Sequence, residues 1–141
     1  MSFLLDTNVL SEASKPQPDE AVKAWLHGVD EDMLFVSAIT LAELRFGIER
    51  LALGARRNSL DLWLRESLIE RLGSRLLVVD SAVAAEWGTL QAQTQARGRR
   101  MDTMDCFLAA TARVHQLIMV TRDTEHFSNA SCELFNPWTA G

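Results

Sequence analysis

The sequence has only two cysteines and three prolines, no tyrosine, and no long uninterrupted hydrophobic run. Cys106 and Cys132 do not form a CxxC pair, which argues against a cysteine-bound zinc ion, and Cys106 lies in an apolar run typical of a buried core. No segment approaches the roughly 20 apolar residues of a membrane span, and the N-terminal residues do not form a signal-type segment. We therefore expect neither a disulfide nor a membrane segment, and a cytoplasmic location.

Several common catalytic arrangements are also missing. The sequence contains no glycine-rich phosphate-binding loop and no serine in a nucleophile-elbow context. The three histidines, His27, His115 and His126, share no spacing typical of a metal site, so we interpret each as a surface or helix-end residue. The chemistry must therefore come from other side chains.

Basic residues are outnumbered, with 14 against 19 acidic residues and a formal net charge of -5. A protein that coats nucleic acid is usually basic, so any nucleic acid would have to bind at a local patch. The densest basic cluster contains Arg97, Arg99 and Arg100. We predict that these arginines contact phosphate groups; the alternative is a solvated helix end, where cations favour the helix dipole.

The length of 141 residues and the 48% hydrophobic content predict one folded domain over residues 1–141. Short apolar runs alternate with amphipathic stretches, which is typical of βαβ units and a parallel sheet. We therefore predict the α/β class, as a three-layer α/β/α sandwich with a short central parallel sheet. The expected strands are 3–5, 34–36, 76–79, 117–120 and one near 133–135. The expected helices are 20–29, 38 to about 54, 56–72, 81–97 and 103–116.

Two aspartates stand at the ends of predicted strands. Asp6 directly follows the first strand, and Asp123 follows the fourth strand by two residues. Because ligands of open parallel sheets bind at the carboxyl ends of the strands, both side chains are expected at the same edge. For either residue alone, a turn or a helix cap is the alternative interpretation.

Glu43 and Asp105 are the other two acidic candidates. The helical neighbours of Glu43 include Phe46 and Gly47, so its face is not a solvated charged one, and Gly47 suggests close backbone approach. The alternative is an exposed glutamate beside the core. Asp105 opens the most apolar helix, where an acidic residue also favours the helix dipole and Asp102 would be the N-cap.

If the four acids lie close together, their negative charges favour the binding of a cation. Crowded carboxylates repel one another and raise one another's pKa unless a cation lies between them. Mg²⁺ is the natural occupant, because it is a hard cation that binds oxygen ligands and retains several waters. The spacing by itself indicates an acidic pocket and a possible metal site.

The chain resembles the PIN-domain nucleases, and specifically the VapC-type toxins of bacterial toxin–antitoxin pairs, with the FitB-like branch the most similar. The resemblance covers essentially the whole chain and rests on matching segments in the right order. These segments are 4–12 (LLDTNVLSE), 15–18 (KPQP), 37–47 (SAITLAELRFG), Asp105 with 107–112 (FLAATA), 120–124 (VTRDT) and 135–138 (FNPW).

The resemblance implies that Asp6, Glu43, Asp105 and Asp123 surround Mg²⁺, for which Mn²⁺ can substitute. Asp6 and Asp105 would bind the metal directly, and Glu43 and Asp123 would hold metal-bound waters or a second ion. Many relatives have asparagine at the position of Asp123, and Asp102 could share the work of Asp105. Thr121 and Asn8 match residues that support the first aspartate.

The resemblance further implies a Mg²⁺-dependent endoribonuclease that acts as the toxin of a toxin–antitoxin pair. Arg97, Arg99 and Arg100 would then contact RNA. The expected partners are a second copy of the chain and a small antitoxin of the ribbon-helix-helix type, through which the complex would bind operator DNA. The alternatives are a DNA-directed structure-specific nuclease and a weakly catalytic partner that helps an antitoxin bind operator DNA.

Overall fold

Five short strands form the centre of the molecule in the computed structural model, which describes residues 1–139. They lie in the order β3-β2-β1-β4-β5, and every pairing is parallel. Their bounds are β1 Phe3–Leu5, β2 Leu34–Ser37, β3 Leu76–Leu77, β4 Ile118–Val120 and β5 Leu134–Phe135. Because all five run in one direction, their carboxyl ends meet at one edge, and the predicted α/β fold with a short parallel sheet is confirmed.

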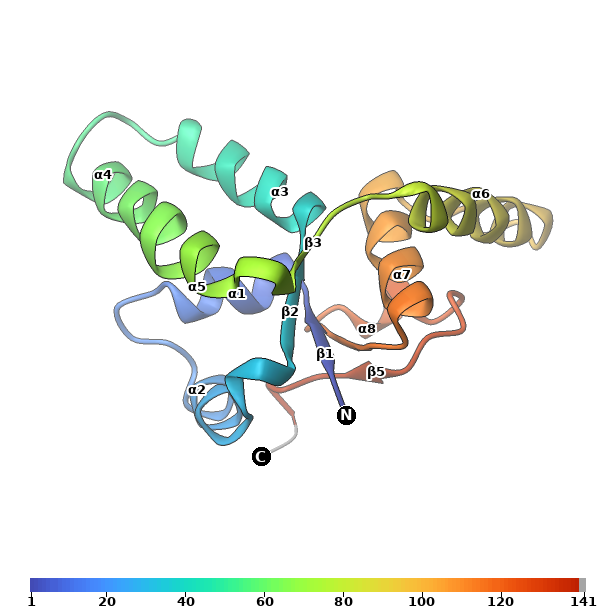
Figure 1. Cartoon of the computed structure of the whole chain (residues 1–141), viewed down its shortest axis with the longest axis horizontal. Coiled ribbons are helices and arrows are strands. Elements are labelled where there is room, and N and C mark those ends of the chain that lie inside the picture. Colours follow the sequence, from blue (N-terminus) through green and yellow to red (C-terminus); the bar gives the residue numbers. More distant parts are fainter. Residues whose placement is uncertain (140–141) are drawn as a thin grey trace.

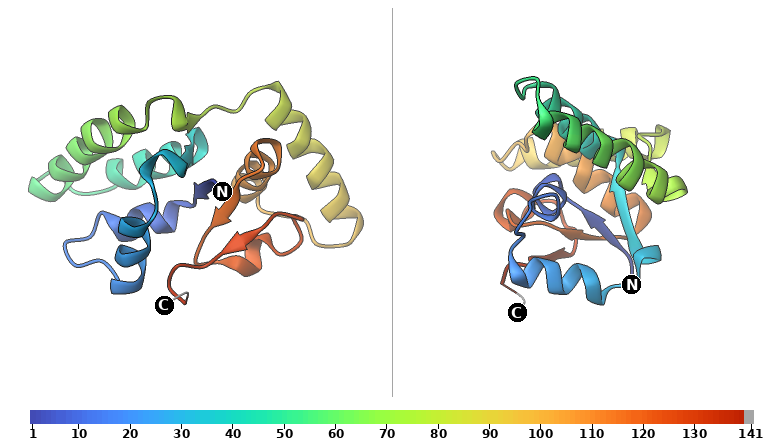
Figure 2. Two further views of the ribbon diagram at one scale, coloured as in Figure 1. Left: turned by 60° about the horizontal axis from the view of Figure 1, so that its bottom comes forward. Right: turned by 90° about the vertical axis from the view of Figure 1, so that its left-hand side faces the viewer.

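Helices cover both faces of this sheet and complete three layers (Figure 1). One side carries α1 Thr7–Ala13, α2 Glu20–Gly28, α3 Ala38–Glu49, α4 Ala55–Leu62 and α5 Glu70–Leu72. The other side carries α6 Ser81–Ala96, α7 Thr103–His115 and α8 Thr124–Phe127. Figure 2 shows α3–α5 and α6 at two ends of the molecule. None of the helices formed by residues 1–139 has the length and apolar character needed to cross a bilayer.

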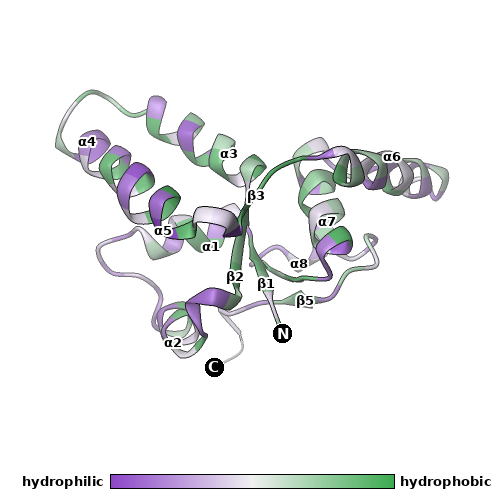
Figure 3. Cartoon of the chain, viewed as in Figure 1, coloured by the Kyte–Doolittle hydropathy of each residue, from purple (hydrophilic) through white to green (hydrophobic). Residues whose placement is uncertain are grey.

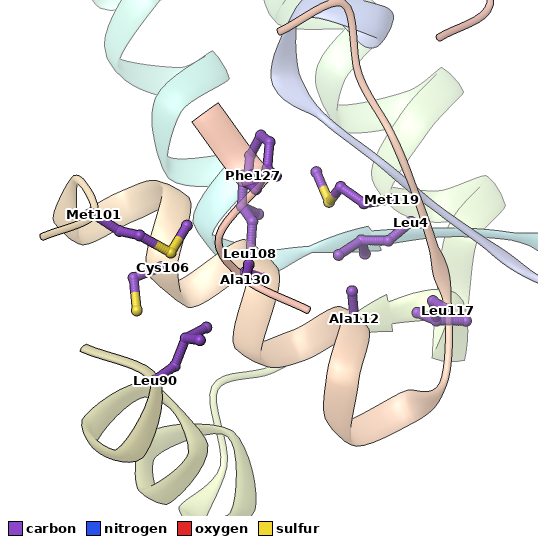
Figure 4. Packing of buried hydrophobic residues seen from close by; sticks show 11 residues of the cluster. Leu4, Leu90, Met101, Cys106, Leu108, Ala112, Leu117, Met119, Phe127 and Ala130 are labelled. Atoms are coloured by element: carbon purple, nitrogen blue, oxygen red, sulfur yellow. The ribbon is translucent and has the colours of Figure 1, made fainter. Parts of the chain in front are cut away.

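Side chains that alternate along the strands divide the core between the two faces. Leu4 belongs to the cluster packed beneath α6–α8, whereas its neighbour Leu5 belongs to the cluster beneath α1–α5. The strands are correspondingly apolar along their length (Figure 3). In the first cluster, Leu90 of α6 points toward Cys106 of α7 (Figure 4). Cys106 is fully buried, as its apolar run predicts.

The element boundaries differ from the predictions in several places. The helix α1 was not predicted, because residues 6–8 were interpreted as the polar end of the first strand. Asp6 is the N-cap of this helix, which agrees with the alternative interpretation of Asp6 as a helix cap. The short helix α8 was also missed. The third strand ends at Leu77 rather than at position 79, since Val78 and Val79 turn outward and are 65% and 36% exposed.

The helix expected over 56–72 is not uniform. Its middle, Trp63–Ile69, is π-helical and lies between α4 and α5. The preceding helix α3 ends at Glu49 instead of near Gly54. Gly54 has a positive φ of 157° and is the N-cap residue of α4. Single-turn 3-10 segments, Glu31–Met33 and Gly73–Arg75, precede β2 and β3.

Candidate active site

The four predicted acids reach one edge of the sheet from four different elements. Asp6 directly follows β1, and its backbone N–H donates to the carbonyl of Val120 at 2.9 Å, which extends the β1–β4 pairing up to the site. Asp123 follows β4, Glu43 lies on α3 beyond β2, and Asp105 lies in the first turn of α7. The parallel sheet thus positions all four at its carboxyl edge.

Hydrogen bonds hold Asp6 in one orientation. Its Oδ1 accepts from the backbone N–H of Thr7 at 2.7 Å, and its Oδ2 accepts from the Thr121 hydroxyl at 2.8 Å. The Thr7 hydroxyl donates to Oε1 of Glu43 at 2.7 Å. Thr121 therefore links Asp6 to the end of β4, and Thr7 links it to Glu43 of α3.

Thr121 is the centre of a second set of contacts. Its buried hydroxyl oxygen accepts from Nδ2 of Asn8 at 3.3 Å and from the backbone N–H of Asp123 at 3.0 Å. Asn8 Nδ2 also donates to Oδ2 of Asp123 at 3.3 Å. Thr121 thus contacts both Asp6 and Asp123, the aspartates that follow β1 and β4, and Asn8 contacts Thr121 and Asp123.

Asp6, Glu43, Asp105 and Asp123 all line one cavity of about 550 Å³. Burial raises the pKa of Asp6; the hydrogen bonds from Thr121 and Thr7 oppose this, and the charges of Glu43 and Asp123 add to it. Burial is also the largest cause that raises the pKa of Asp105 to about 6, with the charges of Asp102 and Asp6 next. The cavity therefore places negative charge where the folded protein does not favour it.

The donors around this cavity fit a hard divalent cation. They are carboxylate and hydroxyl oxygens, which Mg²⁺ and Mn²⁺ prefer, and a cation would relieve the repulsion that raises the two pKa values. Among residues 1–139, no three acidic, histidine or cysteine side chains lie close enough to bind one ion together. Mg²⁺ needs only one or two direct carboxylates when water fills its remaining positions.

The raised pKa of Asp105 predicts a pH-dependent cost to the metal-free protein. Because the folded pKa of about 6 lies above the ordinary 3.8, the contribution of Asp105 to stability is fully present below pH 3.8 and is lost as pH rises through 6. We expect Asp105→Asn to be more stable than the parent chain by about 1–2 kcal/mol at pH 7, a value reduced for solvent screening. Urea unfolding of both proteins in chelator at pH 4 and pH 7 measures this difference. Equal stability of the parent chain and Asp105→Asn at pH 7 would contradict the prediction.

Two sequence interpretations around these acids change. Asp102 is the N-cap of α7, where its carboxylate accepts from the backbone N–H groups of Met104 and Asp105 at 3.1 and 3.3 Å. The N-cap role predicted for Asp102 is therefore confirmed. The prediction that another backbone segment approaches Gly47 closely is wrong, because a Cβ added to Gly47 would meet no atom within 4 Å.

Several residues of the cavity were not predicted as site residues. Lys15, Glu12, Arg122, His126 and Trp138 line it together with the four acids. The pKa of Glu12 is lowered, chiefly by a hydrogen bond from Lys15 and then by the backbone N–H of Asp19. His126 is exposed, as expected, yet its Nδ1 lies 3.7 Å from Oδ2 of Asp105. All but His126 lie in matching sequence segments, but only their positions in the structure identify them as residues of this cavity.

The predicted basic cluster lies beside this cavity. Arg99 and Arg100 line a neighbouring cavity of about 330 Å³, which shares Asp105 and His126 with the acidic one. Arg97 is the C-cap of α6 and does not line either cavity. The structure therefore brings two of the three arginines next to the acids.

An apolar cavity of about 520 Å³ adjoins the acidic one on its other side. It shares lining residues Thr7, Ser11, Lys15 and Glu43 with the acidic cavity. Its apolar lining comes from α3, from α4 and the residue that follows it, and from the loop between them, namely Leu44, Ile48, Leu51, Leu60 and Trp63. The acidic cavity thus adjoins an apolar cavity and a cavity that contains Arg99 and Arg100 together with acidic residues.

The comparisons with known proteins agree on one family. A family model described as the PIN domain matches residues 3–131. The toxin FitB of Neisseria gonorrhoeae is 41% identical over 136 residues, which are 96% of this chain and 98% of that protein. The VapC ribonuclease Y4jK of Sinorhizobium fredii is 38% identical over 136 residues, which are 96% of this chain and 97% of that protein.

The fold comparison gives the same result. A solved structure described as FitAB bound to an IR36 DNA fragment superimposes with a TM-score of 0.92 at 37% identity, and covers 99% of this chain and 97% of that chain. The matching model spans most of the sequence, and the relatives match along almost their whole length. The chain therefore belongs to the PIN domain family, a family of nucleases, which confirms the prediction made from its motifs.

Proposed function

We propose that this chain is a Mg²⁺-dependent endoribonuclease and the toxin of a toxin–antitoxin pair, built as a single PIN domain over residues 1–141. The observation that carries the proposal is the convergence of Asp6, Glu43, Asp105 and Asp123 on one cavity of about 550 Å³. Burial and mutual repulsion disfavour charge on two of these acids, which is the electrostatic condition for cation binding. The ribonuclease name of the Sinorhizobium relative supports RNA as the substrate.

In this proposal Asp6 and Asp105 bind the metal directly, while Glu43 and Asp123 hold metal-bound waters or a second ion. A bound divalent ion supplies an activated water and stabilises the charge that develops on the phosphate. Thr121 and Thr7 fix the Asp6 carboxylate so that no reorientation is required when substrate binds. Asn8 orients Asp123 from the same network.

We propose that Arg97, Arg99 and Arg100 bind RNA phosphates without reading sequence. The position of Arg99 and Arg100 in the cavity that shares Asp105 supports this role. Arg97 has less support, because it lies at the end of α6 outside that cavity. The cytoplasm is the expected location, since it would bring the enzyme to its RNA.

We propose that a ribbon-helix-helix antitoxin inhibits a homodimer of this chain. The C-terminal segment of the antitoxin would occupy the apolar cavity and direct an arginine toward the acids. The similarity to FitAB bound to DNA supports an antitoxin partner and operator binding through that partner.

A cleavage assay tests the proposal. The purified chain is expected to cleave structured RNA in Mg²⁺, and also in Mn²⁺, to leave 5′-phosphate and 3′-hydroxyl ends, and to lose this activity in EDTA. A DNA substrate of the same sequence serves as the comparison. Cleavage of the DNA alone would favour the DNA-directed nuclease, whereas no cleavage of either substrate would favour a partner that only assists an antitoxin.

A further inference from the structure

Arg122 lines the acidic cavity, and its guanidinium donates no hydrogen bond to any group within residues 1–139. Its guanidinium lies over the ring of Trp138 at 5.3 Å from the centroid, and both residues line the cavity. No ion pair or side-chain hydrogen bond of Arg122 is formed within residues 1–139. An exposed guanidinium beside several carboxylates thus remains available to an external anion.

The other cation of the acidic cavity differs from Arg122 in this respect. Lys15, which lines the same cavity, is paired with Glu12 at 3.0 Å. Most other arginines of the described chain also have partners: Arg45, Arg57, Arg65, Arg71 and Arg113 contact carboxylates, and Arg75 donates to backbone carbonyls. Lys15 and Arg122 are the lysine and arginine that line the acidic cavity, and of the two only Arg122 forms no ion pair within residues 1–139.

The C-terminal segment fixes this orientation. Asn136 donates from Nδ2 to the carbonyl of Arg122 at 3.4 Å, and its Oδ1 accepts from the backbone N–H of Trp138 at 2.9 Å. One residue earlier, the backbone N–H of Thr121 donates to the carbonyl of Phe135 at 3.0 Å. The FNPW motif thus attaches to residues 121–122 and brings the indole beneath the guanidinium.

We propose that Arg122, held over Trp138 by this segment, binds the RNA phosphate next to the phosphate at which the strand is cleaved. The inference rests on the proposed ribonuclease function and adds a positioning residue to it. A cavity lined by carboxylates repels a phosphate backbone, and an unpaired guanidinium at its edge offsets this repulsion. The planar fork of arginine also matches two phosphate oxygens at once.

RNA binding without cleavage tests the proposal. A labelled RNA hairpin is titrated with the Asp6→Asn chain in EDTA at several KCl concentrations, with and without Arg122→Ala, and affinity is read from fluorescence anisotropy. We expect Arg122→Ala to weaken binding about tenfold at low salt. The negative slope of log K against log salt should become shallower by about 0.7. Trp138→Leu is expected to weaken binding less and to leave the slope unchanged, because the charge remains.

Arg50 provides a matched control. Its guanidinium lies over the ring of Phe46, also at 5.3 Å, but it lines none of the three adjoining cavities. Arg50→Ala should therefore leave affinity and salt slope unchanged. Arg122→Gln, which retains most of the side chain, must reproduce the loss seen with Arg122→Ala, and thermal melts must match the parent chain.

The outcomes separate this inference from the function on which it rests. If the parent chain cleaves RNA in Mg²⁺ but Arg122→Ala and Arg122→Gln bind the hairpin like Arg50→Ala, the role of Arg122 is refuted and the ribonuclease stands. If the parent chain neither cleaves nor binds RNA, both proposals are refuted. A loss confined to the two Arg122 variants supports the assignment.

Discussion

Replacement of Asp6 by asparagine is expected to reduce metal-dependent RNA cleavage by at least about 100-fold. Asparagine has the same shape and remains a good N-cap for α1, so the hydrogen bond from Thr7 can persist and the protein should stay folded. The change removes one negative charge from the cavity where the proposed metal binds. Gel analysis of RNA cleaved in Mg²⁺ over time measures the loss.

Asp80 offers a control for the Asp6 substitution. It is an exposed aspartate that caps α6 by accepting from the backbone N–H of Val83 at 3.0 Å, and it lies outside the acidic cavity. Asp80→Asn makes the same chemical change at the same type of position and should retain full activity. Equal cleavage by Asp6→Asn and Asp80→Asn, in preparations free of other nucleases, would show that the acidic cavity is not the catalytic centre.

Thr121→Val is expected to lower the free energy of unfolding by about 1–3 kcal/mol and RNA cleavage by about 10- to 100-fold. Valine preserves the shape but removes a fully buried hydroxyl that donates to Asp6 and accepts from Asn8 and from the backbone of Asp123. Asp6 then keeps its burial without its strongest stabilising hydrogen bond, so its pKa should rise further. Urea unfolding in EDTA gives the stability, and the cleavage assay gives the rate.

Thr121→Ser separates the hydroxyl from the rest of the side chain. Serine retains the oxygen and loses only a methyl group, so most of the activity should return with a modest loss of stability. If Thr121→Ser were as inactive as Thr121→Val, packing of the methyl group rather than hydrogen bonding would explain the effect. If Thr121→Val were fully active, the network around Asp6 would have no part in catalysis.

The strands and the position of two of the four acids, Asp6 and Asp123, were accessible from sequence for a physical reason, whereas Glu43 and Asp105 were joined to them by the family resemblance. Apolar runs that end in Asp6 or in Thr121-Arg122-Asp123 have the pattern of buried parallel strands, and the direction of such strands places these ends at one edge. The helix α1 was not accessible in the same way. It has only seven residues, and its N-cap is the same aspartate that was interpreted as a strand end.

Other members of the cavity could not be found from local sequence. Lys15, Arg122 and Trp138 come from separate parts of the chain, and although each lies in a segment that matches the family, neither residue type nor spacing places it at the cavity. His126 was assigned to the surface because it has no metal-type spacing, and its exposure agrees with that; its proximity to Asp105 arises only because α8 packs beside α7. Spacing rules do not report such contacts between elements.

The sequence by itself determined the fold class, the order of the strands along the chain and the place of Asp6 and Asp123 at strand ends, because hydrophobic periodicity and strand direction are local properties. Only the tertiary structure decided which side chains neutralise one another and which remain available. Glu12 lies at the same cavity as the four acids but is paired with Lys15, whereas Arg122 is oriented by Trp138 and unpaired within residues 1–139. Charge balance in a folded site depends on distances between remote segments, and these exist only once the sheet and its helices have packed.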